Sequence, residues 1–126
     1  MGLDLSIRVQ SNHGTDEFGR DTWTVTQLAN LRNCYNILEQ LSNRLEDGFS
    51  NCATYSFYGE TFHEILKGLQ EELTELIQLS KVKELANYQR SIMEALSYEV
   101  SKLEDFIATN NVPDNDTESY EVHAWW

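Results

Sequence analysis

Hydrophobic residues in the second half of the chain recur at spacings of three and four, which is typical of amphipathic helices. The pattern breaks once, near Ser80–Lys83, and predicts two helices over residues 60–79 and 83–109. Because each helix has one apolar stripe and the turn is short, we expect a central antiparallel helical hairpin. Gly68 lies inside the first of these helices and indicates a close helix crossing.

Apolar and polar residues alternate at both ends of the chain, which predicts strands with one buried face. Residues 1–25 are predicted to contain the first such strand, then a turn, and then a short second strand at Thr22–Val25. The last strand covers residues 119–126, and we expect it to pair with the first. Alternation also places Trp125 opposite Trp126, so at least one of them should be exposed or covered by a partner.

A further helix is predicted over residues 25–46. Thr24 and Gln27 have the spacing of a capping box, and Asp47-Gly48 supplies a stop signal. The predicted inner face consists of Leu28, Leu31, Tyr35, Leu38, Leu41 and Leu45. The aromatic segment from Phe49 to Gly59 fits either a short strand or an ordered loop, and the sequence leaves both open.

These elements predict an α+β fold in a single domain over residues 1–126. Its three helices, with the helical hairpin at about 60–109 in the centre, would pack on a small antiparallel sheet. The N- and C-terminal strands would form that sheet. A chain of 126 residues suits one modest hydrophobic core and is too short for two.

The formal net charge of −12 is larger than solubility requires. It argues against a protein that grips a nucleic-acid backbone directly, because that task needs basic residues. The partners that such a surface favours are basic proteins, in particular proteins with a nucleic-acid channel. No apolar run approaches the roughly 18–20 residues that span a bilayer, and no signal peptide opens the chain, so we expect a cytoplasmic protein.

Acidic residues concentrate on the first helix of the predicted hairpin, where Lys67 is the only nearby cation. Three of them fall along one stripe and are separated by whole helical turns of about 5.4 Å. Carboxylates at this spacing can imitate successive phosphates in a basic groove, although a solvated helix face is the simpler interpretation. The acidic residues are Glu60, Glu64, Glu71, Glu72 and Glu75, of which Glu64, Glu71 and Glu75 form the stripe.

Motifs for catalysis or for cofactor and metal binding are not recognisable, so we expect neither an enzyme nor a cofactor or metal site. His13, His63 and His123 have no ligand spacing among themselves or with the cysteines. The segment Tyr55–Tyr58 together with Trp125 and Trp126 could line a pocket for a planar ligand such as a nucleotide. Core packing is the simpler role for these aromatic residues.

The chain opens with Met1-Gly2-Leu3-Asp4, carries Asp47-Gly48, Cys52 and Tyr55 at the spacing Asp-Gly-x-x-x-Cys-x-x-Tyr, and closes on an aromatic strand ending in Trp126. In these features it resembles a set of small uncharacterised proteins of bacteriophages and prophages. The Trp-Arg pair usual early in the first helix of that set is missing, and Leu31-Arg32 stands nearest. The resemblance implies a bacterial host cell, where small acidic phage proteins often inhibit host defence nucleases.

The function predicted from these observations is a non-enzymatic, acidic protein-binding module. We expect a phage-encoded inhibitor that occupies the basic, nucleic-acid-binding site of a host defence protein such as a CRISPR effector. The acidic helix face would orient the complex, while Tyr58, Trp125 or Trp126 would provide a buried anchor. Two alternatives stay open: a protein that sequesters a nucleotide signal, for which Arg8, Arg20, Arg32 or Arg90 would have to converge, and a homodimeric structural or regulatory protein.

Overall fold

The computed structural model describes residues 2–126, apart from the side chains of Asn12 and His13, and Met1 lies outside the described residues. These described residues form three helices and an antiparallel sheet, so the predicted α+β class is confirmed. The elements follow the chain in the order β1 (Asp4–Thr15), β2 (Asp21–Arg32), α1 (Tyr35–Ser42), β3 (Thr54–Tyr58), α2 (Gly59–Ser80), α3 (Asn87–Asn110) and β4 (Ser119–Trp125).

The four strands lie side by side in the order β2-β1-β4-β3. β1 and β4 pair as the alternation at the two ends of the chain predicts, with Leu5 opposite Ala124 and Ile7 opposite Val122. The sheet is nevertheless larger than one made from the terminal strands alone, because β2 and β3 form its two edges. β3 also resolves the segment that the sequence leaves open, since Phe57 pairs with Tyr120 of β4.

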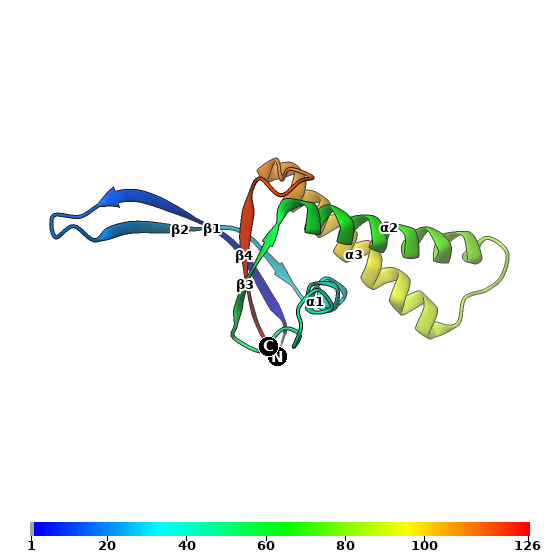
Figure 1. Ribbon diagram of the computed structural model, residues 1–126. Helices are drawn as coiled ribbons and strands as arrows, with labels where there is room; N and C mark the ends of the chain where they lie inside the picture. Colours follow the sequence, from blue (N-terminus) through cyan, green and yellow to red (C-terminus); the bar gives the residue numbers. More distant parts are fainter. Residues whose placement is uncertain (1) are drawn as a thin grey trace.

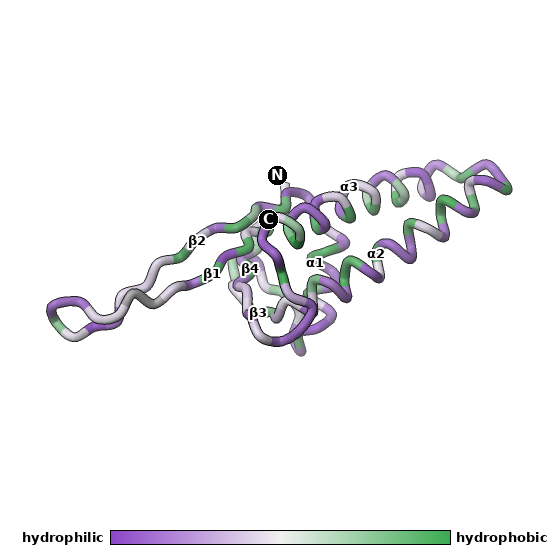
Figure 2. The backbone as a smooth tube through the Cα atoms, turned by 90° about the horizontal axis from the view of Figure 1, so that it is seen from above, coloured by the Kyte–Doolittle hydropathy of each residue, from purple (hydrophilic) through white to green (hydrophobic). Residues whose placement is uncertain are grey.

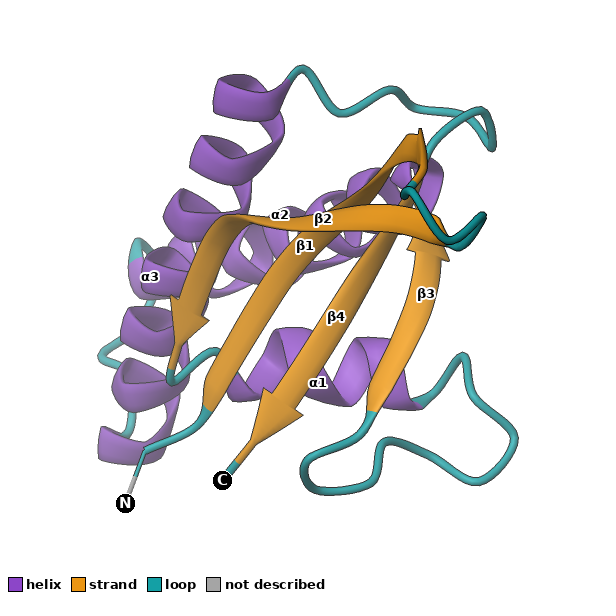
Figure 3. Cartoon of the chain, turned by 90° about the vertical axis from the view of Figure 1, so that its left-hand side faces the viewer, coloured by secondary structure: helices purple, strands orange, loops and turns teal. Residues whose placement is uncertain are grey.

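All three helices cover the same face of the sheet, and the other face is open (Figure 3). The inward residues of β1 and β4 meet the apolar faces of the helices and form the core. Its centre is a cluster of aromatic rings. The centre of the Phe62 ring of α2 lies 5.2 Å from that of Phe106 of α3 and 5.8 Å from that of Tyr120 of β4. The alternation in β4 therefore separates a buried side with Val122 and Ala124 from an open side with His123 and Trp125.

The helix predicted over residues 25–46 is wrong in its first half. Thr22 to Arg32 belong to strand β2, and the helix, α1, covers only Tyr35–Ser42. A register shift explains the error: Ile7 pairs with Ala29 and Arg8 with Gln27, so Leu28 is an extra residue that interrupts the alternation. The interruption gives a strand the three-to-four spacing of a helix.

α2 matches the prediction within a residue at each end, whereas α3 begins four residues later than predicted, at Asn87. The Gln89 side chain accepts a hydrogen bond from the Ala86 amide at 2.9 Å, which ties back the chain just before the helix. The expectation of a close helix crossing at Gly68 is wrong, because no atom would lie within 4 Å of a Cβ added there. Within residues 2–126, no helix is long and apolar enough to cross a membrane.

Two long projections leave the sheet in opposite directions (Figures 1 and 2). On one side, α2 runs away from the sheet and α3 runs back towards it (Figure 1). On the other side, β1 and β2 continue as a two-stranded ribbon, because β1 pairs with β4 only from Asp4 to Arg8. We call this ribbon, residues 9–27, the β arm. The turn predicted between the first two strands is therefore shorter than expected and covers only residues 16–20.

Candidate functional site

The acidic residues of α2 lie on the side of the helix that faces away from the core. Phe62, Ile65 and Leu69 are buried, whereas Glu64, Glu71, Glu72 and Glu75 are exposed and Glu60 is half-buried. At 100° per residue, Glu64, Glu71 and Glu75 form one stripe, and Glu72 points about 80° away from its centre. An open hollow of about 370 Å³ lies along the stripe, lined by Lys67, Gln70, Glu71, Thr74 and Glu75.

Most of these carboxylates have no ion-pair partner within residues 2–126. Glu64 pairs with Arg44 at 3.5 Å, but both side chains are substantially exposed, so the pair is weak. Within residues 2–126, Glu60, Glu71, Glu72 and Glu75 form no ion pair. α2 therefore presents a row of free carboxylates to solvent.

The predicted aromatic anchors do not lie together. Tyr58 ends β3 directly before α2, and its register partner on β4 is Ser119. Trp125 lies six residues further along β4, about 20 Å away at 3.3–3.4 Å per residue. Tyr58 thus flanks the acidic stripe, whereas Trp125 and Trp126 lie at the opposite end of the sheet. The expectation that at least one tryptophan of the pair is exposed is confirmed, since both are.

The aromatic pocket considered for a nucleotide is not formed by the predicted residues. Tyr55 and Phe57 face the helices, where the Phe49 ring contacts Tyr55 at 4.6 Å, while Trp125 lies on the open face. The arginines do not converge either: Arg20 lies at the turn of the β arm and Arg90 in α3. Arg8 and the β2 residue Arg32, which pairs with Asp4, are separated by four positions along β1, about 13 Å.

No family model, curated protein or solved structure matches this chain. Its candidate surfaces therefore stand on their own geometry.

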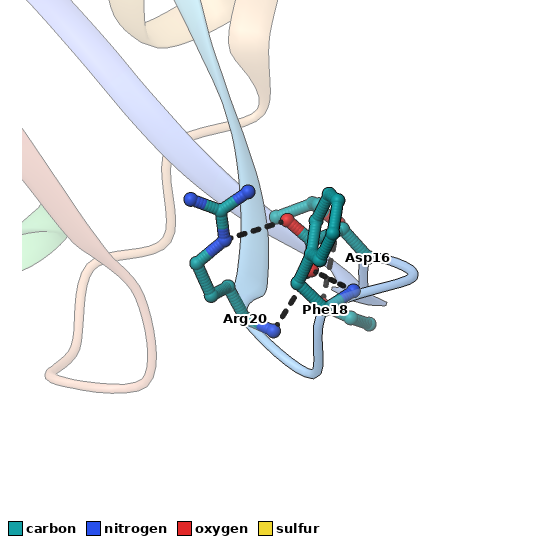
Figure 4. A network of polar contacts seen from close by, with 5 residues as sticks. Asp16, Phe18 and Arg20 are labelled. Atoms are coloured by element: carbon teal, nitrogen blue, oxygen red, sulfur yellow. Dashed lines mark hydrogen bonds and ion pairs between the residues drawn. The ribbon is translucent and has the colours of Figure 1, made fainter.

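The β arm is a surface that sequence analysis missed. Phe18, Trp23 and Val25 are exposed on it, although apolar side chains of this size usually lie inside a fold. Hydrogen bonds close its turn: the Asp16 carboxylate accepts from the amides of Phe18 and Arg20, both at 2.9 Å (Figure 4). The Arg20 guanidinium pairs with Asp16 at 3.1 Å and lies 5.1 Å from the centre of the Phe18 ring. The alternation of apolar and polar residues at Thr22–Val25 is the sequence feature that could have indicated this surface.

The open face of the sheet is polar and internally bonded. Arg8 donates to Ser6, which in turn donates to the Gln27 side chain at 2.9 Å, and Gln10 donates to Glu121 at 2.8 Å. Partial burial and the nearby positive charge of Arg8 lower the pKa of His123. This face therefore carries a neutral imidazole at neutral pH.

A buried carboxylate and thiol lie where α1 begins. Glu99 of α3 accepts a hydrogen bond from the Ile37 amide at 2.9 Å and another from the Asn36 side chain. Burial raises the pKa of Glu99, although these hydrogen bonds oppose the shift. Burial, with the charge of Glu99, also raises the pKa of the Cys34 thiol to about 12. Cys34 is thus protonated at neutral pH and unsuited to act as a nucleophile, and Glu99 serves as a cap for α1.

Metal binding has no recognisable centre in the described part of the chain. No group of three or more histidine, cysteine, aspartate or glutamate side chains in residues 2–126 is arranged to hold an ion. The surfaces that remain as candidates for recognition are the acidic stripe of α2, the β arm, and the exposed aromatic residues at the ends of β3 and β4.

Proposed function

We propose that this chain is a non-enzymatic protein-binding module that docks the acidic stripe of α2 onto a basic site of another protein. The observation that carries the proposal is the row of carboxylates on α2, of which Glu71 and Glu75 have no ion partner within residues 2–126. Opposite charges three or four residues apart stabilise a solvated helix. On α2 only Lys67 has this spacing, to Glu64 and to Glu71, and it forms no ion pair within residues 2–126. The net charge of −12 adds a long-range attraction to any basic partner.

The shape of α2 supports the same function. It extends beyond the sheet as a rod of 22 residues, about 33 Å long, so a groove could receive it without meeting the β arm (Figure 1). Glu71 and Glu75 are one turn apart and Glu64 lies two turns before Glu71, distances of about 6 and 10 Å. At about 3.4 Å per nucleotide along the axis of one strand, these distances correspond to phosphates two and three nucleotides apart.

Tyr58 is the aromatic residue best placed to anchor this contact, because it lies at the beginning of the same helix and is exposed. Trp125 and Trp126 lie too far from the stripe to join the same compact contact. The target class that this surface fits is a host protein with a nucleic-acid channel. Within the bacteriophage setting that the resemblance implies, that class is a defence nuclease such as a CRISPR effector, which the module would inhibit.

Reversing the charge of the acidic stripe tests this proposal. Glu64→Lys, Glu71→Lys and Glu75→Lys together should slow association with the target by about 10- to 1000-fold, because they remove the electrostatic steering. A matched control reverses Glu17, Glu39 and Glu46, which are also exposed and make no ion pair within residues 2–126, and changes the net charge by the same amount.

Two measurements compare the binding and the inhibitory activity of these variants. Pull-down of each tagged variant from bacterial lysate at 50 and 300 mM salt, followed by mass spectrometry, identifies the target. Plaque counts of a phage restricted by a CRISPR nuclease, in cells that make each variant, measure inhibition. Stripe reversal should abolish salt-sensitive capture and inhibition while the control keeps both. Wild-type behaviour of the stripe variant, with an unchanged circular dichroism spectrum, would refute the proposal.

A further inference from the structure

The β arm has a free edge along β2. β2 lies at one end of the strand order, and within residues 2–126 its only partner in the sheet is β1. Main-chain N–H and C=O groups of residues 21–27 therefore point alternately to β1 and to solvent. From Leu28 onwards the edge lies beside α3, because residues of β2 and of α3 line one hollow there. The part of the edge that is open to another strand thus covers residues 21–27.

The residue types that usually protect such an edge do not occur on most of it. Charged residues and proline commonly keep edge strands from pairing with other chains. Although 24% of this chain is charged, residues 22–27 contain neither a charge nor a proline. Trp23 and Val25 are instead 55% and 51% exposed there. An uncharged edge with exposed apolar side chains favours pairing with another strand.

The side chains along this edge are arranged symmetrically about Thr24. A threonine lies two positions to each side of it, and an apolar residue lies one position to each side. An identical strand that pairs antiparallel, with Thr24 opposite Thr24, therefore matches similar side chains on both faces. Aromatic residues opposite β-branched residues, and threonines opposite threonines, are favourable cross-strand pairs. The pairs between the two copies are Asp21 with Gln27, Thr22 with Thr26, and Trp23 with Val25.

Other antiparallel registers fit this edge less well. A shift of two residues in one direction places Asp21 opposite Val25, and a shift in the other direction places Trp23 opposite Gln27. Only the register about Thr24 pairs both apolar side chains and keeps the single charge of residues 21–27 opposite a neutral amide. The free edge is therefore complementary to a second copy of itself.

The same register brings the turn of the arm to the hollow beside α3. This hollow has a volume of about 200 Å³, and both Leu28 and Phe106 form part of its wall. Arg20 of one copy lies opposite Leu28 of the second copy, so the turn lies where the hollow begins. Phe18, in the middle of this turn, is 73% exposed. The hollow is large enough to receive one aromatic ring.

Charges near this contact do not oppose it. Glu17 and Asp21 are the acidic residues of the arm that form no ion pair within residues 2–126. At the hollow of the second copy they meet Lys102 and Asp105, which line it, and Arg32, which directly follows its β2 residues. The acidic stripe lies elsewhere, because α2 and the β arm leave the sheet in opposite directions (Figure 1). Two copies joined through their arms thus keep their acidic stripes far apart.

We infer that the β arm is a dimerisation element. Two copies of this chain pair their β2 edges antiparallel about Thr24, and the turn of each copy lies in the hollow beside α3 of the other. About six to eight main-chain hydrogen bonds cross the twofold axis. Trp23 and Val25 of both copies form one apolar cluster, and Phe18 fills the hollow. The contact leaves the acidic stripe and Tyr58 free, so it is compatible with the proposed docking function and does not depend on it.

Sedimentation equilibrium of the full chain tests the inference, because it reports mass independently of shape. The wild type should approach 29.2 kDa, twice the chain mass of 14.6 kDa, as its concentration rises from 1 to 300 µM. Phe18→Ala should raise the dissociation constant about 10-fold or more, because it leaves the hollow of each copy unfilled. The circular dichroism spectrum should stay unchanged, since Phe18 is exposed in the single chain.

Thr24 provides a test of the register, because it lies on the twofold axis. In Thr24→Lys two lysines face each other across a strand spacing of about 5 Å, and in Thr24→Glu two glutamates do so. Each variant alone should dimerise at least about 10-fold more weakly than the wild type, whereas an equimolar mixture of the two should recover the dimer mass. Edge strands commonly carry exposed charges, so the fold should tolerate both changes.

Ser11→Lys is the matched control. Ser11 is exposed and pairs with Thr24 within the arm, so in the dimer the two new lysines lie three strand spacings apart, about 14 Å. This exceeds the screening length of about 8 Å, so the variant should dimerise like the wild type. A wild-type chain that stays at 14.6 kDa at 300 µM overturns the inference. It is equally overturned by a dimer that Thr24→Lys or Phe18→Ala leaves unchanged, by a mixture that does not recover the dimer, or by equal weakening in Ser11→Lys.

Discussion

The cap that α3 provides for α1 leads to a sharp prediction about stability. α1 has no side-chain cap from its own N-terminal residue and no acidic residue in its first turn. The Glu99 carboxylate takes both roles from another helix, since it accepts from the Ile37 amide and lies at the positive end of α1. Glu99→Ala removes this acceptor while the main chain around it stays in place.

The expected cost follows from the groups left behind. A buried donor without an acceptor costs about 1–3 kcal/mol, and the variant leaves the Ile37 amide and the half-buried Asn36 side chain in that state. Removal of a buried charge recovers part of this cost. We therefore expect a net loss of about 2 kcal/mol in the free energy of unfolding. With about 2.1 cal/mol/K of unfolding entropy per residue over 126 residues, the melting temperature should fall by about 8 °C.

Thermal unfolding followed by circular dichroism at pH 7 measures the loss, with Asp105→Ala as the control. Asp105 is an exposed carboxylate on the same helix, and its removal should change stability by less than about 0.5 kcal/mol. Hydrogen exchange adds a local measurement, because the Ile37 amide should lose protection in Glu99→Ala only. A melting temperature within 2 °C of the wild type would contradict the capping role.

The same residue predicts a dependence on pH. Burial raises the pKa of folded Glu99 above its ordinary value of 4.5, so the folded state binds the proton more tightly than the unfolded chain. The stability contributed by the protonated group is fully present below pH 4.5 and is lost as the pH rises through the folded pKa. The difference in stability between the wild type and Glu99→Gln, taken as wild type minus variant, should therefore decrease from pH 4 to pH 8. An increase over that range would refute the dominance of burial.

Three further substitutions or reactions test the packing of the fold. Gly59→Ala should destabilise the protein by about 1–3 kcal/mol in thermal melts, because the new Cβ would lie 2.2 Å from the Pro113 carbonyl oxygen. Gly68→Ala should stabilise it by about 0.5–1 kcal/mol, since the added methyl group on α2 meets no atom within 4 Å, and a loss of stability would show an unrecognised contact. A thiol reagent at pH 8 should modify exposed Cys52 within minutes and leave buried Cys34 unmodified until the chain unfolds, so rapid modification of two thiols in the native protein would contradict the burial of Cys34.

Local periodicity accounts for the parts of the fold that the sequence predicted correctly. In α2, apolar residues recur without interruption at spacings of three and four, and in β4 apolar and polar residues alternate without interruption. The predicted limits of both elements agree with the structure within a residue. β2 has no such pattern, because the extra residue Leu28 shifts the phase of its alternation. Only the neighbouring strand β1, a long-range partner, decides that Thr22–Arg32 is a strand, and periodicity within a window does not contain that information.

The candidate surfaces likewise differ in whether a local sequence pattern could predict them. The exposed stripe of Glu64, Glu71 and Glu75 was predictable, because it requires only the period of one helix. The separation of Tyr58 from Trp125 depends on the register of β3 against β4, which no local pattern specifies. The exposure of Ile92 and Tyr88 likewise depends on where the sheet ends beneath α3. The helical spacing of three and four continues unchanged through this part of α3, so it does not distinguish exposed from buried positions.

The strand order has a consequence for how the chain folds during synthesis. β4 lies between β1 and β3, although it is the last strand to leave the ribosome. Until residues 119–125 have emerged, β3 has no neighbour to pair with, and the edge of β1 that later pairs with β4 is open. The aromatic cluster that includes Tyr120 is incomplete for the same period. Because the β1–β4 pairs join residues more than a hundred positions apart, and the β3–β4 pairs join residues more than sixty positions apart, the nascent chain cannot close its core early, and its folding should be slow for its length.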